Sequence, residues 1–270
     1  MKITFIGGGN MASAMIGGLI RKRWPRKAFR VVEISQPVRE GLQRQLKVSV
    51  QPAIDAAAAK SGCIVLAVKP QQVCEVAATL RPHLGSQLVV TIAAGIRVKD
   101  LSRWLGGYRR IVRVMPNTPA LVHAGISGLH ATTAVGDTDR ALAEKILGAV
   151  GTTLWVEREE DLDAVTAVSG SGPAYVFYFI EALERAAREL GLSDQAAHRL
   201  AVETFAGATR LAAHSSEPPE SLRSRVTSKG GTTERALASM EAEHVKEAIV
   251  RAVRAAAGRS RELGDELGTD

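Results

Sequence analysis

Residues 3–12 read Ile-Thr-Phe-Ile-Gly-Gly-Gly-Asn-Met-Ala, and this stretch decides the fold of the amino-terminal half. A short β-branched and aromatic run is followed at once by the pattern G-x-G-x-x-A and then by apolar residues at helical spacing over Met11–Arg21. A second strand pattern ends about twenty residues further on. In this strand, turn and helix context the motif predicts a cradle for a dinucleotide.

Each position of the motif has a physical role. Gly7 permits the tight turn, Gly9 lets the backbone approach a pyrophosphate, and Ala12 lets the helix pack closely on the strand. Backbone N–H groups at the helix start, at Asn10 and Met11, are expected to supply the anion site. The alternative is a glycine-rich turn that holds no ligand.

Strand-like runs alternate with helical patterns up to about residue 156, which predicts an α/β domain with a mostly parallel sheet wrapped on both faces. The expected strands are Ile3–Ile6, Arg30–Glu33, Val48–Val50, Cys63–Val68, Leu88–Ile92, Ile111–Val114, Gly125–His130 and Thr152–Val156. The expected helices are Met11–Arg21, Val38–Leu46, Gln71–Leu80, Lys99–Leu105 and Asp139–Ala149.

Beyond Glu157 the strand-like runs vanish, and Ala, Leu, Glu and Arg recur with a helical period. We therefore expect two domains, residues 1–158 and an all-helical domain over 159–270. Its expected helices are Leu162–Val168, Ala174–Leu190, Asp194–His214, Pro219–Val226, Glu234–Met240 and Glu243–Leu267. The last is long and amphipathic, so it needs a partner surface, either its own core or a second subunit.

Composition narrows the class of protein. A balance of 35 basic against 28 acidic residues favours anionic partners, but the few aromatic residues are not interleaved with a basic stripe, so no nucleic-acid partner is expected. No apolar run has the length of a membrane span, so no membrane partner is expected. Two cysteines and six scattered histidines predict neither a metal site nor a disulfide framework, and the first residues do not form a secretory signal. The expected location is the cytoplasm.

The end of the second strand gives conflicting signals about the cofactor. Glu33 can accept hydrogen bonds from both hydroxyls of an adenosine ribose, and its charge repels a 2′-phosphate. Ser35 and Arg39 could instead hold that phosphate. NADH and NADPH therefore both stay open.

A loop that opens a helix spans residues 226–233, which read Val-Thr-Ser-Lys-Gly-Gly-Thr-Thr. Gly230 and Gly231 allow backbone N–H groups to face a ligand. Neither Thr232 nor Thr233 is followed three residues later by Glu or Gln, so no capping box is expected and the helix-end donors are available for a carboxylate. The alternative is an ordinary Thr-capped helix after a Gly-Gly turn.

The helical half also lacks the acid that a carbonyl reductase needs. Dehydrogenases of β-hydroxy acids with this build carry a Lys shortly after a Gly-x-Gly helix start, where this chain has Val176. No lysine occurs between Lys145 and Lys229. A protonated imine already carries the positive charge that draws a hydride, so its reduction depends on positioning and a hydroxyl more than on a strong acid.

The loop at residues 226–233 closely resembles the signature of the pyrroline-5-carboxylate reductases. Further stretches resemble this family in the same order along the chain, at residues 6–12, 67–71, 92–96, 113–120 and 168–175. The resemblance implies a Rossmann-type domain, a helical substrate and dimerisation domain, and reduction of 1-pyrroline-5-carboxylate to L-proline with NADPH or NADH. It also implies a homodimer or a higher oligomer.

The resemblance assigns roles by position. Besides the motif residues and Glu33, Ser35 and Arg39, it places the following along the cofactor: Val68, Lys69, Pro70, Ala93, Ala94, Gly95, Met115, Pro116 and Asn117. The substrate carboxylate is expected at Ser228, Gly230, Gly231, Thr232 and Thr233. The Thr233 hydroxyl is the expected catalytic partner of the ring nitrogen.

Two of these residues could have structural roles only, and the whole chain could have another function. Lys69 could be a surface charge at a strand end, and Asn117, between two prolines, could form a turn. The chain could also be a related imine or oxo-acid reductase of the same build. From another class, it could be an NAD(P)-binding sensor, since fold alone does not fix activity.

Overall fold

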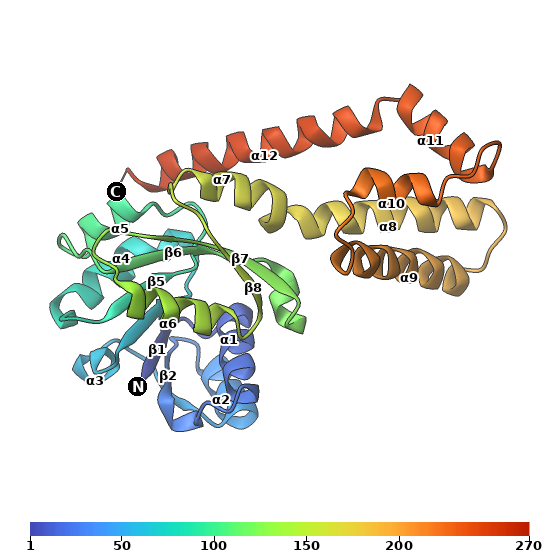
Figure 1. Ribbon diagram of the computed structural model, residues 1–270. Coiled ribbons are helices and arrows are strands. Elements are labelled where there is room, and N and C mark those ends of the chain that lie inside the picture. Colours follow the sequence, from blue (N-terminus) through green and yellow to red (C-terminus); the bar gives the residue numbers. More distant parts are fainter. Residues whose placement is uncertain (270) are drawn as a thin grey trace. The chain divides into compact units, whose positions relative to one another are not determined.

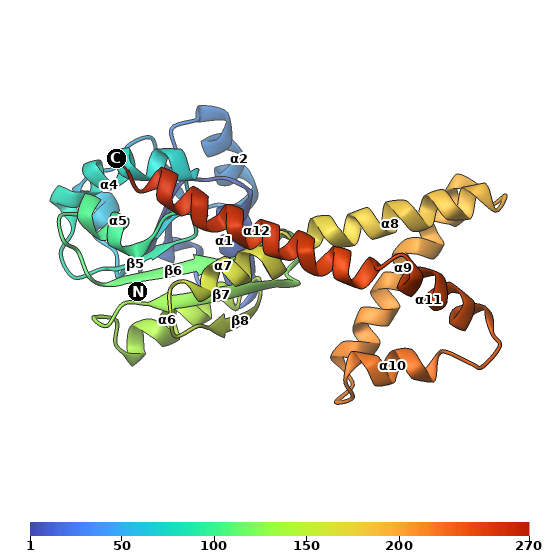
Figure 2. The same cartoon turned by 90° about the horizontal axis from the view of Figure 1, so that it is seen from above.

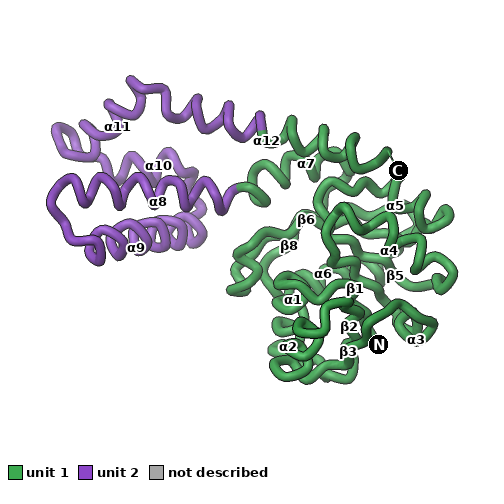
Figure 3. The backbone as a smooth tube through the Cα atoms, turned by 180° about the vertical axis from the view of Figure 1, so that it is seen from behind, with its two compact units in different colours: residues 1–171, 256–270 green, residues 172–255 purple. Residues whose placement is uncertain are grey.

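The computed structural model describes residues 1–269 and divides the chain into two compact units (Figures 1 and 3). Unit 1 comprises Met1–Ser171 and the residues from Ala256 onward, and unit 2 is Gly172–Ala255. The last helix, α12 (Val245–Leu267), therefore begins in unit 2 and ends in unit 1. This division by contacts is not the expected boundary after residue 158, which stays a prediction about domains.

Unit 1 is built on one sheet of eight strands among the described residues, in the order β3-β2-β1-β4-β5-β6-β7-β8. The strands are β1 Ile3–Ile6, β2 Phe29–Val32, β3 Ser49–Gln51, β4 Cys63–Leu66, β5 Leu88–Thr91, β6 Ile111–Met115, β7 Gly125–Ala131 and β8 Gly151–Trp155. Strands β1 to β6 are parallel, β7 is antiparallel to β6, and β8 is parallel to β7. The expected mostly parallel sheet is confirmed.

Helices cover both faces of this sheet. The strand residues on one face pack in a core cluster with α1 (Asn10–Arg21), α2 (Gln36–Leu46) and α6 (Asp137–Leu147), and those on the other face pack with α4 (Val73–Leu80) and α5 (Val98–Trp104). Strand β4 contributes to both clusters: Cys63 and Val65 belong to the first, and Ile64 and Leu66 to the second. All four are fully buried, as the run of apolar residues predicts for a central strand.

Short elements fill the connections, and the sequence patterns did not predict most of them. They are α3 (Ala56–Ala59), four 3₁₀ turns at Arg26–Ala28, Pro70–Gln72, Arg81–His83 and Thr118–Val122, and α7 (Asp161–Val165), which continues into a π-helical turn at Thr166–Gly170. The expected helix at Leu162–Val168 therefore changes its hydrogen-bond pattern partway along. Helix α3 forms because the Asp55 carboxylate accepts a hydrogen bond from the backbone N–H of Ala58 at 2.7 Å.

Unit 2 consists of α8 (Gly172–Glu189), α9 (Asp194–Ala213), α10 (Pro219–Arg225), α11 (Thr232–Ala242) and the first half of α12. It buries small residues such as Ala197 and Ala201. Large apolar side chains stay exposed on it, among them Phe177, Tyr178, Leu200 and Leu211. Apolar surface of this extent marks a site of association with another surface.

Candidate functional site

The residues expected to hold the cofactor follow the carboxyl ends of five parallel strands. Residues 7–12 follow β1, Glu33 to Arg39 follow β2, Val68 to Pro70 follow β4, Ala93 to Gly95 follow β5, and Pro116 and Asn117 follow β6, whose last residue is Met115. Parallel strands direct their carboxyl ends to one edge of the sheet. The crossover in chain order falls between β1 and β4, and open α/β sheets bind ligands at this point.

The glycines of the first turn have the geometry that a phosphate cradle needs. Gly7 has φ +99°, and a Cβ atom there would lie 2.5 Å from the Ala67 carbonyl oxygen, so only glycine fits. A Cβ atom on Gly9 would meet nothing within 4 Å, so this side of the turn is open. Gly9 is the N-cap of α1, no side chain caps the helix, and its first turn holds no acidic residue. The backbone donors at Asn10 and Met11 therefore suit an anion.

A cavity of about 520 Å³ lies beside this turn. Six of the expected residues line it: Gly7, Gly9, Glu33, Ser35, Val68 and Lys69. The other expected cofactor residues are not part of its wall, so the cavity does not reach the turns after β5 and β6. Its wall also includes Pro52, Ala53 and Ile54 after β3, and Gln72 and Val76 near α4. The sequence motifs do not indicate these residues, although the expected strand at Val48–Val50 places residues 52–54 at this edge.

Glu33 is fixed by the backbone on both sides. Its Oε2 accepts a hydrogen bond from the backbone N–H of Gly8 at 2.8 Å, and its Oε1 accepts one from that of Ser35, also at 2.8 Å. The carboxylate is therefore held at the cavity wall, next to the glycine turn. A fixed negative charge here suits ribose hydroxyls and disfavours a 2′-phosphate.

Arg39 is turned toward the main chain. Its Nη1 donates to the carbonyl oxygens of Glu33 at 2.8 Å and Ile34 at 2.7 Å. The guanidinium thus braces the bend after β2 and does not line the cavity. Glu33, which favours ribose hydroxyls, therefore lies at the cavity wall. Of the two residues that could hold a 2′-phosphate, Ser35 also lies at the wall and Arg39 does not.

The turns after β5 and β6 are anchored inside unit 1. The backbone N–H of Ala93 donates to the hydroxyl of the buried Thr91 at 3.3 Å, and Gly95 adopts φ +76°. The amide of Asn117 is engaged at both ends: its Nδ2 donates to the Ser169 carbonyl at 3.1 Å, and its Oδ1 accepts from the backbone N–H of Ile126 at 2.9 Å. Asn117 therefore joins β6, β7 and the π-helical turn, and its contact with a cofactor stays a prediction.

The expected substrate loop lies in unit 2, where α11 begins at Thr232 with Gly231 as its N-cap. Ser228 and Gly231 are close, because a Cβ atom on Gly231 would lie 2.4 Å from the Ser228 Oγ. Gly230 has φ +73°. Thr232 and Thr233 are the first two residues of the helix, so their backbone and hydroxyl groups lie at its positive end.

No capping box forms from Thr232 or Thr233, as expected, but a carboxylate that the sequence analysis did not consider bonds to this loop. Because Gly231 is the N-cap, Glu234 is the third residue of the helix, the position from which a Glu reaches back. Its Oε2 accepts a hydrogen bond from the backbone N–H of Gly230 at 2.6 Å. We had counted from the threonines and so placed the helix start too late.

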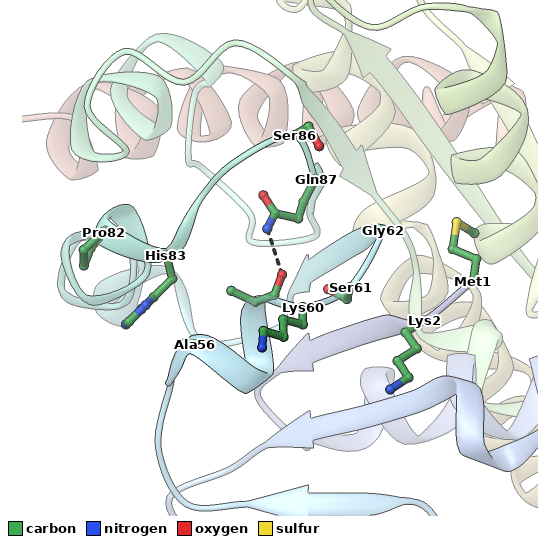
Figure 4. Close-up of a pocket in the computed structure, with 11 residues that line it drawn as sticks. Met1, Lys2, Ala56, Lys60, Ser61, Gly62, Pro82, His83, Ser86 and Gln87 are labelled. Carbon is green, nitrogen blue, oxygen red and sulfur yellow. Dashed lines mark hydrogen bonds between the residues drawn. The ribbon is translucent and has the colours of Figure 1, made fainter.

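A second hollow, of about 560 Å³, lies at the opposite edge of the sheet, beside the first residues of β1 and β4 (Figure 4). Its basic side chains, Lys2, Lys60 and His83, point in different directions (Figure 4). The hydrogen bond drawn there, from Gln87 Nε2 to the Ala59 carbonyl at 2.7 Å, holds two loops together. We assign no chemistry to this hollow.

Three further features were sought in the described part of the chain: a metal site, a membrane-spanning helix and a reactive thiol. No group of His, Cys, Asp and Glu side chains there could hold a metal ion. Among the described helices, none is long and apolar enough to cross a membrane. Cys63 is fully buried, and burial raises the pKa of its thiol, as fits a small apolar core residue.

The fold and the open glycine turn define an NAD(P)-dependent oxidoreductase. A family model for NADP oxidoreductase, coenzyme F420-dependent, matches residues 2–95, and one for pyrroline-5-carboxylate reductase dimerisation matches residues 159–263. The chain belongs to the pyrroline-5-carboxylate reductase family. It is 43% identical to the pyrroline-5-carboxylate reductase of Pseudomonas aeruginosa over 99% of this chain and 98% of that one.

Solved structures agree with this assignment. The pyrroline-5-carboxylate reductase of Coxiella burnetii superposes with a TM-score of 0.93 at 39% identity, covering 97% of this chain and 98% of that one. The Plasmodium falciparum pyrroline carboxylate reductase, solved with NADP bound, has a TM-score of 0.86 at 30% identity and covers 98% of both chains. The dimerisation model over residues 159–263 also accounts for the exposed apolar side chains of unit 2.

Proposed function

We propose that this protein reduces 1-pyrroline-5-carboxylate to L-proline, the last step of proline biosynthesis, using NADH or NADPH. The observation that carries the proposal is the open, uncapped start of α1 at Gly9, in a chain that is 43% identical to a pyrroline-5-carboxylate reductase over nearly its whole length. The cofactor supplies the hydride that the imine carbon receives.

Within unit 1 the chain's own residues position the cofactor. The N–H groups at Asn10 and Met11 bind the pyrophosphate, and Gly9 leaves room for it because it has no side chain. Glu33 and Ser35 lie at the cavity wall where the adenosine ribose is expected. The turns at Ala93–Gly95 and Met115–Asn117 take the nicotinamide half of the cofactor.

Within unit 2 the loop at Ser228–Thr233 binds the substrate carboxylate. The positive end of α11 and the backbone N–H group of Thr232 suit a negative charge, whereas the N–H of Gly231 donates to the Ser228 carbonyl at 3.0 Å. Thr233 places a hydroxyl one residue further into the helix, where it orients the ring nitrogen or a water that protonates it. Orientation supplies most of the acceleration, since no strong acid is required.

We also infer a homodimer or a larger assembly through unit 2, and a place in the cytoplasm. The match to a dimerisation family and the exposed apolar residues of α8 and α9 support the assembly. The two cysteines, one of them fully buried, fit a reducing compartment.

A spectrophotometric assay tests the function. Purified protein is mixed with 1-pyrroline-5-carboxylate and either NADH or NADPH, and loss of absorbance of the reduced cofactor is followed while proline is quantified. Open-chain 2-hydroxy and 3-hydroxy acids with the oxidised cofactors serve as the comparison, because Val176 replaces the lysine used on them. Cofactor binding without turnover of any substrate would indicate a sensor and overturn the proposal.

A further inference from the structure

The carboxyl-terminal turns of α12 lie beside α5 (Figure 2), and hydrogen bonds join them to the segment that follows β5, all within unit 1. Arg97 Nη1 lies 2.6 Å from Asp265 Oδ1, and Arg97 Nη2 donates to the Arg261 carbonyl at 3.1 Å. Further along, Arg103 Nη2 donates to the Gly268 carbonyl at 2.7 Å. The end of α12 is therefore fixed beside α5.

An apolar contact places this helix end directly on the turn at Ala93–Gly95. A Cβ atom on Gly95 would lie 2.9 Å from Leu267 Cδ1 and 3.6 Å from Leu263 Cβ. Gly95 itself is buried, and Leu267 packs against the core cluster that contains Ala93 and Ile96. Because Gly95 has no side chain, these leucines pack directly against the backbone of the turn.

The next residues along the chain are held from another direction. The backbone N–H of Val98, at the start of α5, donates to Glu159 Oε1 at 2.7 Å, and the same oxygen lies 2.8 Å from Nη1 of the buried Arg113. On α12, the Ser260 hydroxyl donates to Asp163 of α7 at 2.6 Å. The turn at Ala93–Gly95 thus lies between Thr91, which holds Ala93, and an anchored start of α5.

We propose that Leu267 and the Arg97–Asp265 pair are positioning residues that set the turn at Ala93–Gly95 for contact with the nicotinamide half of the cofactor. This inference rests on the proposed function, because only that function gives the turn a cofactor to contact. A small shift of such a turn misplaces the reacting carbon and lowers the rate steeply. The dimerisation family model covers α12 as far as residue 263. The contacts described here indicate a second role, within unit 1, for the last turns of this helix.

The ion pair is poorly suited to a purely structural role. The Asp265 side chain is 71% exposed, and water screens a pair of this exposure, so it adds little to folding stability. What the pair does fix is the direction of the Arg97 side chain, which also bonds to the Arg261 carbonyl. Its removal is therefore expected to move the turn without unfolding the protein.

The test compares four variants of the full-length chain. Leu267→Ala removes the contact with the turn and Leu267→Met largely keeps it, while Asp265→Asn breaks the ion pair. Glu266→Gln is the matched control, since Glu266 lies next to Asp265 and pairs only with Arg259 of the same helix in the described contacts. For each variant the KM of the cofactor, the KM of the pyrroline, kcat and the melting temperature are measured.

Leu267→Ala is expected to raise the cofactor KM at least about fivefold and Asp265→Asn about twofold to threefold, with the pyrroline KM unchanged. Leu267→Met and Glu266→Gln should match the wild type. A merely structural role would instead lower the melting temperature while kcat and both KM values stay unchanged, and this result would overturn the inference. A wild type that fails to reduce the pyrroline contradicts the proposed function, whereas an active wild type with an unaltered Leu267→Ala variant contradicts only the role of α12.

Discussion

The carboxylate of Glu33 accepts a hydrogen bond from the backbone N–H of Gly8 at 2.8 Å, inside the glycine turn that is expected to bind the cofactor's phosphates. A second bond, from the N–H of Ser35, fixes the other oxygen. The negative charge of Glu33 at the cavity wall is therefore held by the framework of the turn through two backbone hydrogen bonds.

Glu33→Gln is expected to improve the use of NADPH relative to NADH about tenfold, which corresponds to about 1.4 kcal/mol. The neutral amide keeps an acceptor for one N–H and removes the repulsion of a 2′-phosphate. The measurement is kcat/KM with each cofactor. Glu40→Gln, a change of equal charge at an exposed position on α2, is the control. An unchanged ratio would show that Glu33 does not select the cofactor.

The glycines of the turn should respond differently to alanine. Gly7→Ala forces a side chain into the left-handed region and against the Ala67 carbonyl, so a loss of about 1–3 kcal/mol in the free energy of unfolding is expected. Gly9→Ala places its methyl group in open space, so stability should be unaffected while the cofactor Kd rises about tenfold. Denaturant titration and fluorescence titration with the reduced cofactor separate the two effects. Equal affinity in the Gly9→Ala variant would place the pyrophosphate elsewhere.

Asn117→Ala is expected to destabilise unit 1 by about 1–3 kcal/mol, because it leaves the Ile126 N–H and the Ser169 carbonyl without their partner. Urea denaturation followed by circular dichroism measures the loss. Thr118→Ala, at the neighbouring exposed position, should be neutral. Weaker cofactor binding by Asn117→Ala at full stability would instead favour direct contact between this amide and the nicotinamide.

Thr233→Ala is expected to lower kcat on the pyrroline about 10²-fold, while Thr233→Ser retains most of it. Both variants keep the start of α11, because its N-cap is Gly231. Steady-state kinetics and the melting temperature provide the check. If alanine turns over the imine as fast as threonine, the assigned contact with the ring nitrogen is wrong.

Glu234→Ala is expected to lower the KM of the pyrroline about twofold to fivefold, because it releases the Gly230 N–H and removes a negative charge from the loop that binds a carboxylate. Glu241→Ala, on the same helix and exposed, is the control. The KM of the cofactor should stay constant in both. A raised pyrroline KM would mean that Glu234 shapes the loop more than it competes with the substrate.

The sequence predicted the positions of the strands to within one or two residues, because each is a short apolar run bounded by turn residues. It also predicted that the residues expected to bind the cofactor lie at one edge of the sheet, because parallel strands share their carboxyl edge. It could not show that the Asn117 amide is engaged at both ends, because Ile126 and Ser169 are distant in sequence. The role of Glu234 was missed because a shift of one residue in the predicted helix start changes which side chain occupies the third helical position. From that position a Glu can bond back to the loop before the helix.

The contacts of Gly268 with Arg103 and of Leu267 with Gly95 have a practical consequence for preparing the protein. An affinity tag fused to the carboxyl terminus would adjoin the segment that rests on the turn after β5, and it is expected to alter the kinetic constants of every preparation that carries it. Met1 is 64% exposed and lies at the far edge of the sheet, so an amino-terminal tag is the safer choice for quantitative enzymology.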